Sequence, residues 1–166
     1  MRLTLAAFAC VIAATPVNAD GLESFGTTMK YGLPLAAAIC AADQRRLEDF
    51  AVRGALQALV VLGLKTVFDG STLGVRPTGE GRGFPSGHSA AAGFGAADLA
   101  GKCWKDEPAW GAAAYGAAGL TAYSRVASGA HTTDQAIAGA LIGISFGAAS
   151  FGIGSEGVSF NFGMRF

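Results

Sequence analysis

Three consecutive segments in the second half of this chain carry small residues at every third or fourth position. These positions are Ala90, Gly93 and Ala97, then Ala112, Gly116 and Gly119, then Ala136, Gly139 and Gly143. Residues at this spacing share one face of a helix, and a face without large side chains lets two helix backbones approach closely. The spacing therefore predicts an all-α fold in which helices pack tightly into a bundle.

Turn and loop signals separate five predicted helices, at residues 22–42, 50–68, 89–104, 109–123 and 132–151. A further helix at the N-terminus would make the bundle one of five to six. In the second helix an apolar pattern at helical spacing, from Leu56 to Leu64, is interrupted by Arg53, Gln57 and Lys65. Such polar residues favour a soluble bundle, or a helix facing a polar cavity, over one surrounded by lipid.

The chain has a predicted leader at residues 1–19, a domain at 20–153 and a tail at 154–166. In the tail, large apolar residues alternate with small or polar ones from Val158 to Phe166. That alternation is typical of a half-buried strand, so we expect a short C-terminal strand that packs on the domain or on a partner.

Composition places the chain between an ordinary soluble domain and a multi-span membrane protein. Of its 166 residues 51% are hydrophobic and only 14% are charged, and the length suits a single domain. The 12 basic and 12 acidic residues cancel, so no overall field attracts nucleic acid, which we do not expect as a partner. Any anion binding must come from local clusters of charge.

The first 19 residues have the pattern of a signal peptide. Arg2 provides a positive start, residues 3–15 are apolar, and the small residues at 17–19 resemble a cleavage site. The alternative is an uncleaved transmembrane helix, which needs about 20 apolar residues, more than this stretch has. We therefore expect an exported, periplasmic protein, and membrane association stays open.

The predicted domain contains one pair of cysteines and one pair of oppositely charged residues that could interact. Export would leave Cys40 and Cys103 as an even pair in an oxidising compartment, where they either form a disulfide or remain two small core residues. Asp98 and Lys102 are one helical turn apart, and we expect them to form a surface ion pair.

Two clusters hold the chain's only histidines. His88 closes the run GFPSGH at residues 83–88, where a long glycine-rich loop meets a helix, and His131 follows Ser124-Arg125 at the next helix boundary. Backbone N–H groups at a helix start and arginine side chains both bind phosphate oxygens. Asp134 or Gln135, on the same helix face as His131, can hold one ring nitrogen and leave the other free as a nucleophile. These clusters predict a phosphate site.

The tetrapeptide at 85–88 (PSGH), followed by Ser124-Arg125, five residues and His131, resembles the signature of the type 2 phosphatidic acid phosphatase superfamily. That superfamily also contains bacterial class A acid phosphatases and vanadium haloperoxidases. The resemblance runs from about Leu64 to Gly143. It implies a phosphatase that hydrolyses a phosphomonoester or pyrophosphate, in a phosphorylated lipid or a small soluble ester.

Two positions depart from the family pattern. The first family motif is Lys-x6-Arg-Pro, with six residues between the lysine and the arginine. Here ten residues separate Lys65 from Arg76-Pro77. An insertion of four residues at about 69–72 would explain this difference. The family usually has aspartate four residues after the second histidine. This chain has Gln135, as dolichyl-diphosphatase-like and glucose-6-phosphatase-like members do, with Asp134 one residue earlier.

The resemblance also implies residue roles. His131 attacks phosphorus and becomes a phosphohistidine, His88 is the general acid for the leaving oxygen, and Gln135 or Asp134 orients His131. The implied phosphate ligands are Lys65, Arg76, Ser86, Gly87 and Arg125. No metal or other cofactor is implied for such a phosphatase.

Two alternatives belong to other functional classes. The same cage holds vanadate in the haloperoxidases, so a vanadate-dependent haloperoxidase is one. The other is a phosphate-binding protein with weakened catalysis, suggested by Gln135 and by the stretched first motif.

Overall fold

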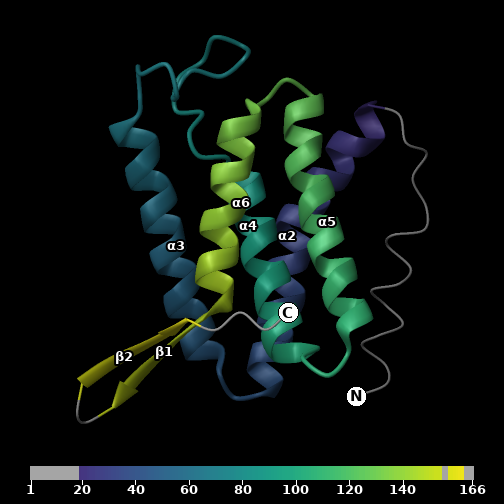
Figure 1. Cartoon of the computed structure of the whole chain (residues 1–166), viewed down its shortest axis with the longest axis vertical. Coiled ribbons are helices and arrows are strands. Elements are labelled where there is room, and N and C mark those ends of the chain that lie inside the picture. Colours follow the sequence, from purple (N-terminus) through teal and green to yellow (C-terminus); the bar gives the residue numbers. More distant parts are fainter. Residues whose placement is uncertain (1–18, 155–156, 163–166) are drawn as a thin grey trace.

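The computed structural model describes residues 19–154 and 157–162, which form five α-helices, a π-helical segment and a β-hairpin (Figure 1). The elements are α2 (Ala19–Asp43), α3 (Leu47–Val67), α4 (Gly87–Asp98), η1 (Leu99–Cys103), α5 (Pro108–Ala127), α6 (Thr133–Ala148), β1 (Ala149–Gly154) and β2 (Gly157–Phe162). The predicted all-α bundle is confirmed. The predicted leader lies outside the described residues, except for its last residue, which begins α2.

Helix α4 is the centre of the bundle and packs against α2, α3, α5 and α6 (Figure 1). From Ser89 to Asp98 all its residues but one are buried. The hydrophobic core around it is built mostly from small side chains of α2, α4 and α5, among them Ala37, Ala92, Ala96, Ala114, Ala117 and Ala118. Small side chains leave little distance between helix axes, so contacts between backbones dominate the packing.

The closest of these contacts joins α6 to α4. Three glycines of α6, four residues apart, lie against three carbonyl groups of α4 and its cap, also four residues apart. The pairs are Gly139 with Ser86, Gly143 with Ala90 and Gly147 with Phe94, and a Cβ at each glycine would strike the carbonyl oxygen. The predicted small-residue faces of these two helices are therefore confirmed.

The predicted packing face of α5 is wrong. Ala112, Gly116 and Gly119 are exposed, and a Cβ at either glycine would meet nothing within 4 Å. The buried face instead carries Ala114, Ala117 and Ala118, which belong to the core. Alanine and glycine are so frequent in α5 that more than one face satisfies the spacing, and only the neighbouring helices select between them.

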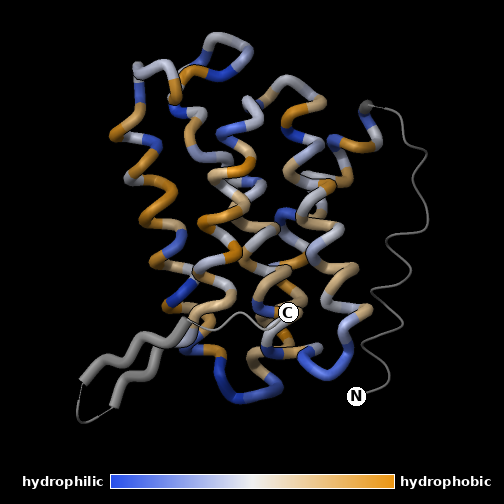
Figure 2. Tube along the Cα trace, in the orientation of Figure 1, coloured by the Kyte–Doolittle hydropathy of each residue, from blue (hydrophilic) through white to orange (hydrophobic). Residues whose placement is uncertain are grey.

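Helix α3 has the reverse of the usual polarity. Its buried residues are Arg53, Gln57 and Val61, whereas its large apolar side chains point outward, with Leu59 65% exposed and Leu62 54% exposed. Figure 2 shows this outer side of α3 as largely hydrophobic. Arg53 faces inward because the interior offers it a buried carboxylate, that of Asp98.

Among the described helices, α3 alone is long and apolar enough to cross a membrane. Exposed apolar side chains also occur on other helices, including Leu35 and Ile39 of α2, Leu120 of α5 and Leu141 of α6. The outer surface of the bundle is thus apolar well beyond one helix.

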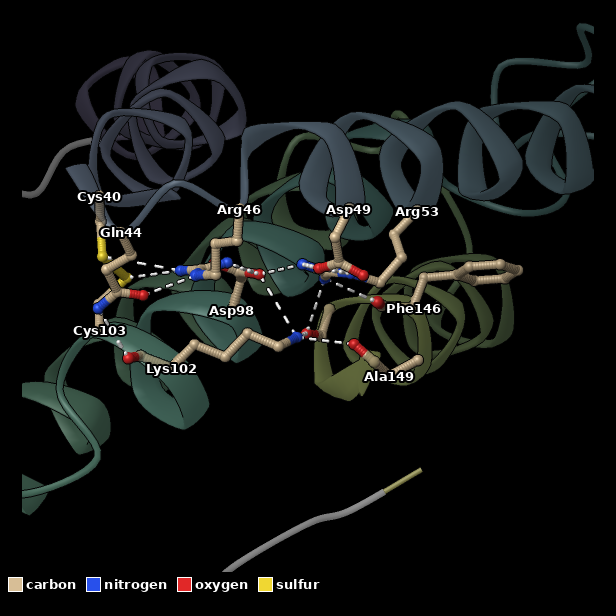
Figure 3. A network of polar contacts seen from close by, with 11 residues as sticks. Cys40, Gln44, Arg46, Asp49, Arg53, Asp98, Lys102, Cys103, Phe146 and Ala149 are labelled. Carbon is tan, nitrogen blue, oxygen red and sulfur yellow. Dashed lines mark hydrogen bonds and ion pairs between the residues drawn. A yellow bond between two sulfur atoms is a disulfide. The ribbon is translucent and has the colours of Figure 1, made fainter. Parts of the chain in front are cut away.

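A buried ion cluster lies where α3 begins and α4 ends (Figure 3). Asp98 is fully buried and forms ion pairs with Arg46 at 2.8 Å, with Arg53 at 2.6 Å and with Lys102 at 3.5 Å. Arg53 also binds the Asp49 carboxylate at 2.7 Å. The predicted ion pair of Asp98 and Lys102 is present, but its expected place at the surface is wrong, because two arginines that lie far earlier in the sequence enclose the carboxylate.

Cys40 and Cys103 form a disulfide beside this cluster, which decides between the two outcomes left open above. It ties α2 to η1 (Figure 3). Arg46 Nη2 lies 3.1 Å from the sulfur of Cys103 and so joins the disulfide to the ion cluster.

Helix α6 ends three residues before its predicted end. Lys102 Nζ donates to the carbonyls of Gly147 at 2.8 Å and of Ala149 at 2.7 Å, and a cation satisfies the free carbonyls of a helix C-terminus. The chain continues as β1, which pairs antiparallel with β2 so that Ala149 faces Phe162 and Gly154 faces Gly157. A strand is therefore present in the predicted tail, and β1 was not predicted.

Candidate active site

Both histidine clusters lie at the end of the bundle opposite to the ion cluster (Figure 1). This end holds the long connection between α3 and α4 and the short turn between α5 and α6. The backbone N–H of Ser86, which precedes α4, donates to the carbonyl of Gln135 in α6 at 2.8 Å. The α3–α4 connection is thus joined directly to the first turn of α6.

The α3–α4 connection folds its extra residues into a compact turn. Gly74 returns to Phe68 so closely that a Cβ on Gly74 would strike the Phe68 carbonyl. Gly83 N–H then donates to Gly74 O at 2.7 Å, and Lys65 Nζ donates to Arg82 O at 2.8 Å. The inserted residues therefore loop out, and Lys65 stays at the site although ten residues separate it from Arg76.

Ser86 is the N-cap of α4. Its hydroxyl oxygen accepts from Ser89 N–H at 3.4 Å and from the Ser89 hydroxyl at 3.1 Å, and its side chain is fully buried. The N–H groups of Gly87 and His88 then point out of the helix start, where an anion is favoured. A Cβ at Gly87 would meet nothing within 4 Å, so the backbone there is open to a ligand.

The α5–α6 turn places Arg125 and His131 together. His131 N–H donates to the Arg125 carbonyl at 3.0 Å, and Gly129 takes the left-handed conformation that the turn requires. The buried Ser124 hydroxyl, one residue before Arg125, donates to Thr121 O at 2.7 Å within α5. Ser124 is thus a packing residue, and the turn holds Arg125 and His131 close together.

Gln135 determines which nitrogen of His131 bears a hydrogen. The Gln135 amide group donates from Nε2 to Leu73 O at 2.8 Å and to Val75 O at 2.9 Å. These two carbonyls fix the amide orientation, so Oε1 faces His131 Nδ1 at 3.0 Å and must accept from it. His131 therefore carries its hydrogen on Nδ1, and the lone pair of Nε2 is left available.

Of the two residues proposed to orient His131, Gln135 makes the contact. Asp134 is exposed on the first turn of α6, whereas Gln135 is buried and also completes a capping box with Thr132. A carboxylate at position 135 would face the carbonyls of Leu73 and Val75, which repel it. The glutamine and the lengthened α3–α4 connection therefore fit each other.

Both histidines are held neutral in the free protein. Burial is the main cause that lowers the pKa of His131 to about 4. The charges of Arg76, Lys65 and Arg125 lower it further, and the hydrogen bond that His131 donates to Gln135 opposes them. Burial likewise lowers the pKa of His88 to about 4, and the charge with the largest effect on it is Lys30. A neutral imidazole is the form that can act as a nucleophile.

Two arginines at the site keep unused donors. Arg125 is 7% exposed and is held by Glu23 of α2, with Nη1 3.3 Å from Oε1. The buried Nε atoms of Arg125 and of Arg76 have no hydrogen-bond partner among the described residues. Because a buried donor without a partner is unfavourable, these atoms favour a bound anion.

Sequence reasoning missed the contribution of α2, which brings Glu23 and Lys30 to the site. The only signal in the sequence for this contribution was Lys30, a charged residue inside an apolar helix. The described residues contain no group of three side chains suited to holding a metal ion.

The family model of the PAP2 superfamily matches residues 54–156, more than half of the chain. The chain therefore belongs to the PAP2 superfamily, whose members are mostly phosphatases. Searches of curated proteins and of solved structures found no match.

Proposed function

We propose that this protein is a phosphatase that works through a phosphohistidine formed on His131. The observation that carries the proposal is the orientation of His131 by Gln135, which leaves Nε2 unprotonated among three cationic side chains. Family membership supports phosphatase chemistry in general, and the geometry supports these particular roles.

In the first step Nε2 of His131 attacks phosphorus, so an N–P bond forms and the bond to the leaving oxygen breaks. His88 gives its proton to the leaving oxygen. The negative charge of a bound phosphate raises the pKa of His88 and so supplies the protonated form that this step needs. Arg76, Arg125 and Lys65 bind the phosphate oxygens, together with the N–H groups of Gly87 and His88.

In the second step water attacks the phosphohistidine and His88, now neutral, takes a proton from that water. The N–P bond breaks, phosphate leaves, and both histidines return to their starting forms. The Gln135 oxygen holds the Nδ1 hydrogen throughout, so the ring does not turn away from phosphorus.

We propose further that the substrate is a lipid phosphate and that the bundle is in contact with a membrane. The outward apolar side chains of α3, such as Leu59 and Val67, support this, because burying them in lipid is favourable. The disulfide supports a periplasmic location, since such bonds persist in oxidising compartments.

The deciding experiment measures turnover of phosphatidate in mixed micelles and of p-nitrophenyl phosphate, with quenching to trap a phosphoenzyme. We expect His131→Ala to lower kcat by at least about 1,000-fold and to abolish an acid-labile, base-stable phosphoenzyme. Thr133→Ala is the matched control, since Thr133 is exposed two residues away. Full activity in the His131 variant would refute the mechanism, and a preference for the soluble ester would refute the lipid assignment.

A further inference from the structure

Helix α2 contributes to the site although it lies before the matched family region. Glu23, Gly26 and Lys30 are three and four residues apart, so they share one side of α2. Glu23 forms an ion pair with Arg125, and a Cβ at Gly26 would strike the hydroxyl of Ser124. This side of α2 therefore faces the start of the α5–α6 turn, and Lys30 follows on the same side.

The depth of Lys30 follows from the packing of α2 on α4. Gly95 of α4 lies against Leu33, and Cys103 of η1 is bonded to Cys40, so the two helices run in the same direction. Seven residues before Gly95 on α4 is His88, and seven residues before Leu33 on α2 is Gly26. His88 and Gly26 therefore lie at the same level of the bundle. Lys30 begins one turn deeper, and helical side chains lean toward the N-terminus, so its ammonium group reaches toward His88.

The charges around the two histidines differ in a way that separates two sides of the site. Lys65 and Arg125 lower the pKa of both histidines, whereas Arg76 lowers that of His131 and Lys30 is the charge with the largest effect on the pKa of His88. In an in-line displacement the nucleophile and the leaving group are on opposite sides of phosphorus. Lys30 is therefore on the side of the leaving group.

Lys30 is available to bind an anion. It is half-buried, and its Nζ lies 4.4 Å from the centre of the Tyr31 ring, which is itself largely exposed. No ion pair of Lys30 is found within the described ranges, in contrast to Arg125, which Glu23 already neutralises in part.

We propose that Lys30 binds a negatively charged leaving group, so that the protein acts on diphosphates in preference to monoesters. This inference rests on the proposed phosphatase function. In a diphosphate the bond that breaks joins the terminal phosphorus to the bridging oxygen. His88 protonates that oxygen and Lys30 neutralises the charge of the phosphate that leaves with it. A monoester loses an uncharged alcohol, which gives Lys30 nothing to bind.

The test compares farnesyl diphosphate with farnesyl monophosphate in the same detergent, for the wild-type protein and for Lys30→Gln. We expect kcat/KM of the variant to fall about 10- to 100-fold on the diphosphate and less than about threefold on the monophosphate. Lys30→Arg should stay within about threefold of wild type on both. Lys105→Gln is the control for a surface lysine, since Lys105 is exposed in the turn before α5.

Three outcomes would overturn the proposal: an equal loss on both substrates, no loss on the diphosphate, or a wild-type protein that cleaves only the monophosphate. Equal thermal unfolding temperatures of wild type and variant check that Lys30→Gln is folded. Failure of the phosphatase assignment is recognised separately, because the wild-type protein would then cleave neither substrate.

Discussion

At the scale of single residues, Gln135 connects three features of the site. It accepts from His131 Nδ1, donates to the carbonyls of Leu73 and Val75, and is one half of the cap of α6. One side chain thus sets the tautomer of His131, anchors the inserted turn and begins the helix. This explains how an uncharged residue can replace the aspartate typical of the family.

We predict that Gln135→Ala lowers kcat about 10- to 100-fold, because the His131 ring loses its orienting partner. Gln135→Glu should be destabilised by about 1–3 kcal/mol, since a carboxylate would face two carbonyl oxygens. Asp134→Asn should change kcat by less than about threefold, because Asp134 is exposed. Steady-state kinetics and urea unfolding measure these effects, and a larger loss in the Asp134 variant would contradict the assignment.

The lowered pKa values predict an acidic activity optimum. The nucleophile His131 must be unprotonated, as it is above about pH 4, and the acid His88 must be protonated, as it is in the free protein only below about pH 4. We therefore expect kcat/KM to decrease by up to about tenfold per pH unit above pH 5. His88→Asn should flatten this decrease, and a wild-type profile level from about pH 5 to 8 would contradict it.

At the scale of secondary-structure elements, the contact of α6 with α4 positions the site. The three α6 glycines at four-residue spacing bring α6 onto the carbonyls of Ser86, Ala90 and Phe94. Ser86 caps the helix that carries His88, and α6 begins beside His131. The distance between the two histidines therefore depends on how closely these helices pack.

We predict that Gly143→Ala lowers the unfolding free energy by about 1–3 kcal/mol, because its Cβ would strike the Ala90 carbonyl. Gly116→Ala is the matched control. Its Cβ would meet nothing within 4 Å, and the change should stabilise the protein by up to about 1 kcal/mol through helix propensity. Chemical denaturation of both variants checks this, and a Gly143 variant as stable as wild type would contradict the packing.

At the scale of the whole molecule, a few charged and polar side chains are buried beside the hydrophobic core, and much apolar surface is exposed. Arg53, Asp98 and Gln57 are buried, whereas the exposed side chains of α3 are mostly apolar. The ion cluster and the disulfide lie at one end of the bundle, and the two histidines lie at the other. A buried ion pair that loses one partner is strongly destabilised, so this end depends on all its members.

We predict that removing the disulfide by Cys40→Ser with Cys103→Ser lowers the unfolding free energy by about 4 kcal/mol, because the bond closes a loop of 63 residues. Thermal unfolding with and without reductant checks this in the unaltered protein. Phosphatase activity below the unfolding temperature should be retained, since the disulfide is at the end opposite to the site. An unfolding temperature insensitive to reductant would contradict the prediction.

The sequence by itself determined the helical bundle and both histidine motifs, because helix periodicity and the spacing of the motifs are local properties. Motif spacing also brought His88, Arg125 and His131 to one site. Only the tertiary structure decided that Gln135 holds His131, that α5 packs on Ala114 and Ala117, and that α2 brings Glu23 to Arg125. Each of these depends on which elements are neighbours, and neither composition nor periodicity records that. The reversed polarity of α3 has the same origin, because the partner of Arg53 lies 45 residues away.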